Sequence, residues 1–318
     1  MMWRAVQSKV ESRGGVVRLN ADVVQVLRVG RRIEQIIVRA DGGEHVVRGD
    51  EFLSSMPLTE FITKLHPPPP LAVLTAAARL RYRDFLTVCL IVNRPEVFPD
   101  NWIYVHDPEV RVGRIQNFKN WSREMVPDPD KSSLGLEYFC TEGDELWRLD
   151  DDQLIELAKR EIDRVGLVSA EEVEDGRVVR VPKSYPMYDS GYREALATVR
   201  DFVDSLNNFH TIGRNGLHRY DNQDHAMLTG MLAVRNVVLR ERHDLWMVNV
   251  DQEYHEETRG DVGPDEAARV GQTTLTRGSG ERIVMPRRSW FRATIRGMVT
   301  RLVLGLRQPK GRRAAADL

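Results

Sequence analysis

The sequence has little cysteine, no long uninterrupted apolar run and almost no net charge. Only Cys89 and Cys140 occur in 318 residues, and they do not form a metal-binding spacing or the disulfide framework of a small secreted domain. The first ten residues lack the apolar core of a signal peptide, and no stretch reaches the ~18 apolar residues of a transmembrane helix. These absences predict a soluble protein in a reducing, cytoplasmic setting.

The formal net charge of −1 is unevenly distributed along the chain. Residues 287–318 contain nine Lys and Arg and a single acid, Asp317, so this segment carries +8 and residues 1–286 carry −9. A mildly acidic body argues against binding of nucleic acid across the fold. Apolar residues recur at helical spacing from Trp290 to Leu306. This pattern predicts a basic amphipathic helix that contacts either an anionic membrane surface or a protein surface.

Several motifs of enzymes and binding proteins are also missing. The eight histidines include no H-E-x-x-H pair, and no G-x-S-x-G elbow is present, so the sequence predicts no metal site and gives no support for a hydrolase. A strand followed by G-x-G-x-x-G and a helix, the fingerprint of a dinucleotide-binding unit, is absent as well.

What the sequence does contain is an irregular alternation of strand and helix patterns, with 42% hydrophobic and 29% charged residues. This composition is that of a globular protein, and the alternation predicts a mixed α/β architecture. Helices are predicted at 3–10, 58–65, 71–80, 154–162, 192–206 and 224–240. Strands are predicted at 16–19, 23–29, 33–38, 44–48, 52–57, 84–92, 102–106, 113–118, 134–140, 178–181 and 209–212. Residues 251–286 are predicted to form a flexible linker.

The most informative stretch runs from Ile212 to Ala233. A strand enters a glycine-rich turn, and a polar segment then opens a long apolar helix. Free amide groups and the positive dipole end of a helix suit an anionic or electron-rich ligand. Gly213 would let the backbone approach that ligand, and Arg214 could pair with a phosphate. An ordinary turn in which an Asp or Asn caps the helix fits the same residues.

This stretch resembles the carboxy-terminal flavin segment of the FAD-dependent amine oxidoreductases, the group that includes protoporphyrinogen oxidases and UDP-galactopyranose mutases. The Gly-Arg pair, Tyr220, the Asn and Asp residues and the long apolar helix stand in that group's order. Further similarity lies in the Gly-Gly-x-Val-Arg-Leu-Asn stretch after the first helix, in Ser-Met-Pro at 55–57 and in Lys-x-Tyr-Pro-x-Tyr at 183–188.

The resemblance implies FAD as cofactor and assigns roles to individual residues. Gly213, Arg214 and Asn222 would lie near the ribityl and pyrophosphate part of FAD. The backbone amide of Gln223 would face the pyrimidine carbonyl of the flavin and stabilise negative charge on the reduced ring. Tyr220, Tyr185 and Tyr188 are candidates for the cavity beside the isoalloxazine, although buried core tyrosines would fit Tyr185 and Tyr188 equally well. No side chain stands out as a catalytic base.

The implied fold is part of a glutathione-reductase-like FAD-binding fold with an inserted mixed-sheet substrate domain. The expected divisions are residues 1–57 and 186–250 in the FAD-binding domain, 58–185 in the substrate domain, 251–286 as linker and 287–318 as the basic tail. Because the G-x-G-x-x-G unit is missing, we expect a truncated oxidoreductase acting on a small-molecule substrate, or a fragment completed by a partner that supplies this unit. A UDP-galactopyranose mutase-like isomerase, with His218 in place of an expected tyrosine, is the alternative activity.

Overall fold

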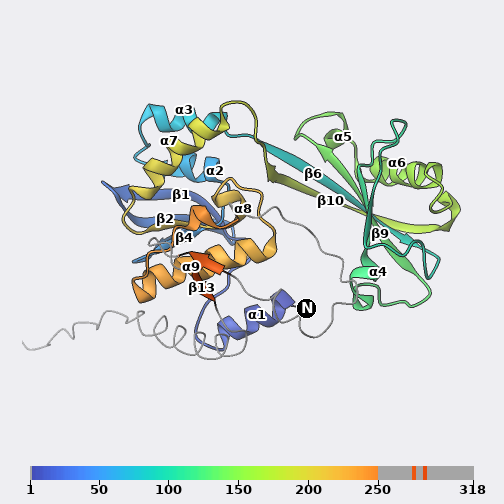
Figure 1. Cartoon of the computed structure of the whole chain (residues 1–318), viewed down its shortest axis with the longest axis horizontal. Coiled ribbons are helices and arrows are strands. Elements are labelled where there is room, and N and C mark those ends of the chain that lie inside the picture. Colours follow the sequence, from blue (N-terminus) through green and yellow to red (C-terminus); the bar gives the residue numbers. More distant parts are fainter. Residues whose placement is uncertain (1, 250–273, 277–281, 285–318) are drawn as a thin grey trace, which may run out of the picture. The chain divides into compact units, whose positions relative to one another are not determined.

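The computed structural model describes residues 2–249, 274–276 and 282–284 (Figure 1). Contacts between Cα atoms divide the chain into two compact units. The first unit comprises Met1–Val23, Val38–His45 and Met231–Leu318, and the second comprises Val24–Ile37 and Val46–Gly230. The basic segment 287–318 and most of the predicted linker lie outside the described residues.

The second unit contains a five-stranded antiparallel sheet in the order β10-β6-β9-β8-β7. Its long strands β6 and β10 run side by side in Figure 1. The most apolar run of the sequence forms β6, in which alternate side chains from Leu86 to Val92 are fully buried. The strands are β6 (Tyr82–Val92), β7 (Trp102–Tyr104), β8 (Arg114–Asn117), β9 (Ser132–Cys140) and β10 (Val173–Pro186).

One face of this sheet is covered by helix α6 (Asp151–Arg164), which buries Leu154, Ala158 and Ile162 against it. The helix begins at Asp150 because this residue and Gln153 form a reciprocal capping box. Short elements connect the strands: α4 (Phe118–Trp121), η1 (Arg123–Met125), α5 (Glu145–Arg148) and η2 (Ala170–Glu172). The opposite face carries partly exposed side chains, including Phe139 and Val181.

The second unit also contains a parallel pair of strands, β4 (Phe52–Ser54) and β11 (Phe209–Thr211). The ring of Phe209 stacks on Phe61 of helix α2 at 3.9 Å between centroids. Asn208 is buried, and its side chain bonds the backbone N–H and C=O of Ile33. Three further helices belong to this unit: α3 (Leu71–Arg79), α7 (Tyr192–Asp204) and the short α8 (Gly213–Gly216), besides α2 (Leu58–Lys64).

A four-stranded sheet has the order β3-β2-β1-β5, with β1 and β5 parallel. Its strands are β1 (Asp22–Val29), β2 (Arg32–Ala40), β3 (Gly43–Arg48) and β5 (Leu65–His66). The predicted hairpin at Asp41-Gly42-Gly43 forms, with positive φ angles at Asp41 and Gly42. The mixed α/β class predicted from the sequence is therefore confirmed.

The first unit contains helix α1 (Met2–Glu11), which ends before Gly14 in the left-handed conformation. Residues 16–19, predicted as a strand, have no strand structure. Helix α9 (Gln223–Leu239) runs on into this unit and is followed by η3 (Leu245–Met247). Strands β12 (Thr274–Thr276) and β13 (Arg282–Val284) pair antiparallel within the range predicted as a linker.

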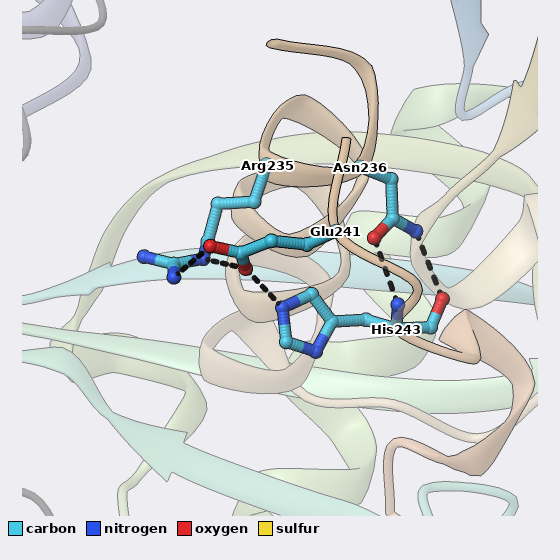
Figure 2. Close-up of polar contacts among 4 residues, drawn as sticks. All are labelled: Arg235, Asn236, Glu241 and His243. Carbon is cyan, nitrogen blue, oxygen red and sulfur yellow. Dashed lines mark hydrogen bonds and ion pairs between the residues drawn. The ribbon is translucent and has the colours of Figure 1, made fainter. Parts of the chain in front are cut away.

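Arg235, Asn236, Glu241 and His243 form a group of polar contacts where α9 ends, named here the clasp (Figure 2). Arg235 donates two hydrogen bonds to the carboxylate of Glu241, at 2.6 and 2.5 Å, and the ring of His243 contacts the same carboxylate at 2.5 Å. The side chain of Asn236 bonds both the N–H and the C=O of His243, each at 2.8 Å. These contacts hold the segment that contains Glu241 and His243 against the last turns of α9.

Candidate functional site

The predicted flavin segment begins where two parallel strands end side by side. Thr211 of β11 lies opposite Ser54 of β4, and the next N–H, that of Ile212, donates to the carbonyl of Ser54 at 2.9 Å. A Cβ atom on Gly216 would lie 2.6 Å from Thr211 Oγ1 and 3.0 Å from the carbonyl oxygen of Ser54, so only glycine fits there. In α/β proteins, ligands bind at such carboxyl ends of parallel strands.

Gly213 follows β11 with φ +71°, in the left-handed region that favours glycine. Its N–H donates to the buried hydroxyl of Thr229 at 2.9 Å, which ties the turn to α9. A Cβ on Gly213 would meet only the Cβ atoms of Ala226 and Ser55, both at 3.8 Å. The turn is therefore fixed by its hydrogen bond and dihedral angle, and a Cβ atom at this position would contact Ala226 and Ser55 without a clash.

Helix α9 opens at Gln223, which is exposed. Asn222 occupies the N-cap position, because its carbonyl accepts the N–H of Ala226 at 3.0 Å. The first amides of a helix have no acceptor within the helix, and the dipole gives this end a partial positive charge. The structure thus brings Asn222 and Gln223 to a helix start, as the sequence predicts.

Arg214 is held by the chain itself. Its Nε donates to the carbonyl of Asp221 at 2.6 Å, and its Nη1 donates to the carbonyl of Ser184 at 3.1 Å. Its guanidinium carbon lies 5.0 Å from the ring centroids of both Tyr185 and Tyr220. These contacts fasten the loop before α9 to the end of β10.

The three predicted tyrosines form one group. The rings of Tyr185 and Tyr220 stack with centroids 5.6 Å apart and planes 14° apart. The hydroxyl of Tyr188 accepts the N–H of Tyr220 at 2.5 Å, and the Tyr188 ring lies 4.8 Å from that of Tyr192. Burial raises the phenol pKa of both Tyr188 and Tyr220, so both phenols are neutral at pH 7.

A β-bulge in β10 places Tyr185 beside the other two tyrosines. The pairing of β10 with β6 shifts register between Val181 and Tyr185, and Lys183 in this bulge has φ +53°. The buried carboxylate of Asp84 on β6 accepts the N–H of Lys183 at 2.6 Å and that of Glu142 at 2.5 Å. Asp84 therefore fixes the bulge from the neighbouring strand.

The uncovered sheet face adds an ion pair that the sequence analysis did not identify. Glu137 on β9 is buried and accepts hydrogen bonds from Arg114 and Gln116. Burial opposes the charge of Arg114, but the hydrogen bond and the charge of Glu137 outweigh it and raise the guanidinium pKa. The Arg114 guanidinium lies 5.8 Å from the ring centroids of Trp102 and Tyr104. The ring centroids of Phe85 and Phe139 lie 5.8 and 6.2 Å from that of Tyr185, so these two rings connect this sheet face to the tyrosines.

His218, which stands where a mutase-like sequence would have tyrosine, is buried with 1% of its surface exposed. Its ring packs edge-on against Tyr82 at 4.8 Å. Burial lowers its pKa to about 4, although the backbone of Met187 and the charge of Asp189 oppose this shift. The Met187 backbone lies near the ring, but neither ring nitrogen reaches hydrogen-bond geometry with a partner among the described residues, and neither does the buried side-chain oxygen of Asn215.

Two hollows of the second unit lie away from these residues. One of about 500 Å³ lies between α3 and α7, and another of about 370 Å³ lies beside Tyr104 and Arg164. Across the described ranges, no group of histidine, cysteine and acidic side chains is arranged to hold a metal ion. Within the same ranges, no helix has the length and apolar composition that a membrane span requires.

Comparison with known proteins identifies similar folds but no sequence family. No family model and no curated protein matches the chain. A crystal structure of reduced UDP-galactopyranose mutase superposes with a TM-score of 0.66 at 19% identity, covering 78% of this chain and 53% of that one. A protein from Exiguobacterium sp. 255-15 assigned as a protoporphyrinogen oxidase gives 0.56 at 14% identity, covering 75% and 51%.

Putrescine oxidase bound to putrescine gives a TM-score of 0.51 at 17% identity, covering 73% of this chain and 51% of that one. The chain thus spans about half the length of the structures that it matches. At these identities the similarity establishes the fold, which is that of the first two enzymes over most of the described residues.

Proposed function

We propose that the chain is part of an FAD-dependent oxidoreductase of the amine oxidase and protoporphyrinogen oxidase group. The observation that carries the proposal is the meeting of the β4 and β11 carboxyl ends with the start of α9 and the stacked tyrosines. The fold similarity to a protein assigned as a protoporphyrinogen oxidase supports it. The flavin would accept a hydride from a carbon–nitrogen or carbon–carbon bond of a small-molecule substrate.

The residues at the strand ends fit a bound polar cofactor. Gly213 holds the turn after β11 in a left-handed conformation, and the buried oxygen of Asn215 has no hydrogen-bond donor among the described residues. A hydroxyl of the cofactor would satisfy this acceptor, since an unpaired buried polar atom is unfavourable. Asn222 and the Gln223 amide would bind the flavin end, and Tyr185, Tyr188 and Tyr220 would line the substrate side. Arg214 would hold the loop between them.

A titration of the purified chain with FAD tests the proposal through flavin absorbance and fluorescence. The decisive variant is Gln223→Pro, which removes the first amide of α9 and is tolerated at this helix position. Its matched control is Gln223→Ala, which removes only the side chain. We expect Gln223→Pro to bind FAD or riboflavin more weakly than Gln223→Ala. Equal affinities for the two variants would contradict a flavin at this helix start.

The missing G-x-G-x-x-G unit sets the expected strength of binding by the chain alone. The sequence holds no such unit for the ADP half of FAD. We infer that these 318 residues alone bind FAD weakly, whether the unit for the ADP half belongs to a longer form of this chain or to a partner. A tight stoichiometric yellow complex of these residues alone would refute this inference. Contact of segment 287–318 with an anionic membrane remains a separate proposal, tested by vesicle binding with and without that segment.

A flavin-dependent isomerase is the second candidate, because the UDP-galactopyranose mutase structure superposes with the TM-score of 0.66. In this case reduced flavin would act as a nucleophile on a nucleotide sugar without net oxidation. His218 gives this candidate less support, since its ring is 1% exposed and packs edge-on against Tyr82. Incubation of the flavin-loaded protein with UDP-galactopyranose under reducing conditions decides between the two: appearance of the furanose isomer would favour the mutase.

A further inference from the structure

We propose that the Arg214 guanidinium permanently occupies the cation-binding position beside the Tyr185 and Tyr220 rings and thereby makes the site selective against ammonium substrates. The inference deepens the proposed function, on which it rests for the meaning of this surface as a substrate site. Its basis is the position and the charge of one guanidinium group.

The position is that of a cation–π contact. The Arg214 guanidinium carbon lies 5.0 Å from the centroid of each tyrosine ring, within the ~6 Å over which a cation is attracted to an aromatic face. The two rings are nearly parallel, 14° apart. A pair of parallel tyrosines would otherwise offer its faces to the ammonium group of a substrate. Here the protein's own cation occupies that place.

The charge of Arg214 is not neutralised by its contacts. Within the described residues the guanidinium bonds the carbonyl oxygens of Asp221 and Ser184 and contacts no carboxylate. The nearby Arg114 differs, because Glu137 neutralises it. Both arginines favour the ionised form of Tyr220, which shows that their fields reach this ring. The charges of the two arginines at this ring would repel a second cation.

Arg214 cannot readily leave this place. Its two hydrogen bonds join the end of β10 to the loop before α9, so an entering ammonium group would have to break both. A neutral substrate, or one with negative charge at the end that reaches the tyrosines, meets no such penalty. The geometry thus favours neutral or negatively charged substrates over ammonium substrates at this site.

The test compares two probes of similar shape, benzylammonium and neutral benzyl alcohol, by the NMR shifts of the Tyr185 and Tyr220 rings. Tyr185→Phe and Tyr220→Phe variants assign the signals. In the wild-type chain we expect benzyl alcohol to bind at least as tightly as benzylammonium. In Arg214→Gln, which keeps a hydrogen-bond donor but removes the charge, benzylammonium should bind about tenfold more tightly than in the wild type.

Preferential binding of benzylammonium by the wild-type chain at these rings would overturn the proposal, and this result does not depend on the variant folding. An unchanged affinity for benzylammonium in folded Arg214→Gln would overturn it as well. Because the tyrosine signals are read without flavin, failure of the FAD titration would count against the proposed function alone.

Discussion

Glu137 and Arg114 lie directly opposite each other on β9 and β8 and form an ion pair on the sheet face that α6 leaves uncovered. Only 2% of the Glu137 side chain and 17% of the Arg114 side chain are exposed. Gln116 donates to the same carboxylate. Burying two charged groups costs desolvation energy, which the ion pair and its hydrogen bonds offset. Removal of one partner is therefore costly, because it leaves the other charge buried without compensation.

Glu137→Gln should therefore destabilise the protein by about 3 kcal/mol, because it leaves the Arg114 guanidinium half-buried without a counter-charge. The measurement is the free energy of unfolding in urea. Glu44→Gln is the control, since its pair with Arg39 is exposed and should contribute less than ~0.5 kcal/mol. A loss at Glu137 no larger than at Glu44 would show that the pair is not needed for folding.

Asp84→Asn should loosen the bulge that carries Tyr185. An amide has one acceptor oxygen, so it cannot accept the N–H groups of both Lys183 and Glu142 as the carboxylate does. We expect faster hydrogen exchange at these two amides and altered ring signals of Tyr185 and Tyr220, with a destabilisation of about 2 kcal/mol. Asp175→Asn, an exposed change on the same strand β10, should leave the exchange of both amides unaltered.

Stability should fall in mild acid because of His218. Its folded pKa of about 4 lies below the ordinary histidine value of 6.5. A depressed pKa contributes full stability above pH 6.5, and this contribution is lost as the pH falls from 6.5 to 4. The loss is about 3 kcal/mol for a shift of this size.

His218→Phe should remove most of this pH dependence, measured as the free energy of unfolding at pH 7 and pH 4.5. The exposed His106→Gln is the control and should retain the wild-type slope. An unchanged slope in His218→Phe would mean that the ring is protonated inside the fold without penalty.

The clasp after α9 predicts a second, more acidic transition. Burial favours neutral Glu241, but the hydrogen bonds from Arg235 and His243 outweigh it and lower the carboxyl pKa. The clasp is therefore at full strength above the ordinary glutamate pKa of about 4.3 and weakens as the pH falls through the lower folded value. Glu241→Gln should expose the Asn236–His243 contacts to faster hydrogen exchange at neutral pH. Glu96→Gln, at an exposed site, should show the wild-type exchange rates.

Much of the fold is predictable where local pattern and long-range contacts agree. The helices at 58–65 and 71–80 form within about a residue of the predicted ends, because prolines precede both starts. The core strand at 84–92 forms as β6, because a short apolar run that contains β-branched residues favours a buried strand. Residues 16–19 have strand-forming side chains but pair with no strand in the part of the chain that the structure describes, and pattern alone cannot supply a partner strand.

The parts that sequence cannot predict depend on pairings between distant residues. Strand β10 spans 14 residues, although only 178–181 have an apolar strand pattern, because its backbone pairs with β6 along nearly its whole length. The bulge depends on Asp84, which is 99 positions from Lys183. The grouping of Tyr185 and Tyr220 was predicted from resemblance, and their joint contact with Arg214 became visible only in three dimensions.

Strand β6 runs without interruption from the residues that contact the tyrosine site to the apolar core of the five-stranded sheet. Its first residue, Tyr82, donates to the carbonyl of Asn215 at 3.2 Å, Asp84 fixes the bulge, and Leu86 to Val92 fill the core. Because side chains alternate between the faces of a strand, deleting one residue between Asp84 and Leu86 would exchange the faces on one side of the gap. A deletion or insertion within β6 would therefore disrupt this site, whereas a change of length in the connections at its two ends would leave the two faces in place.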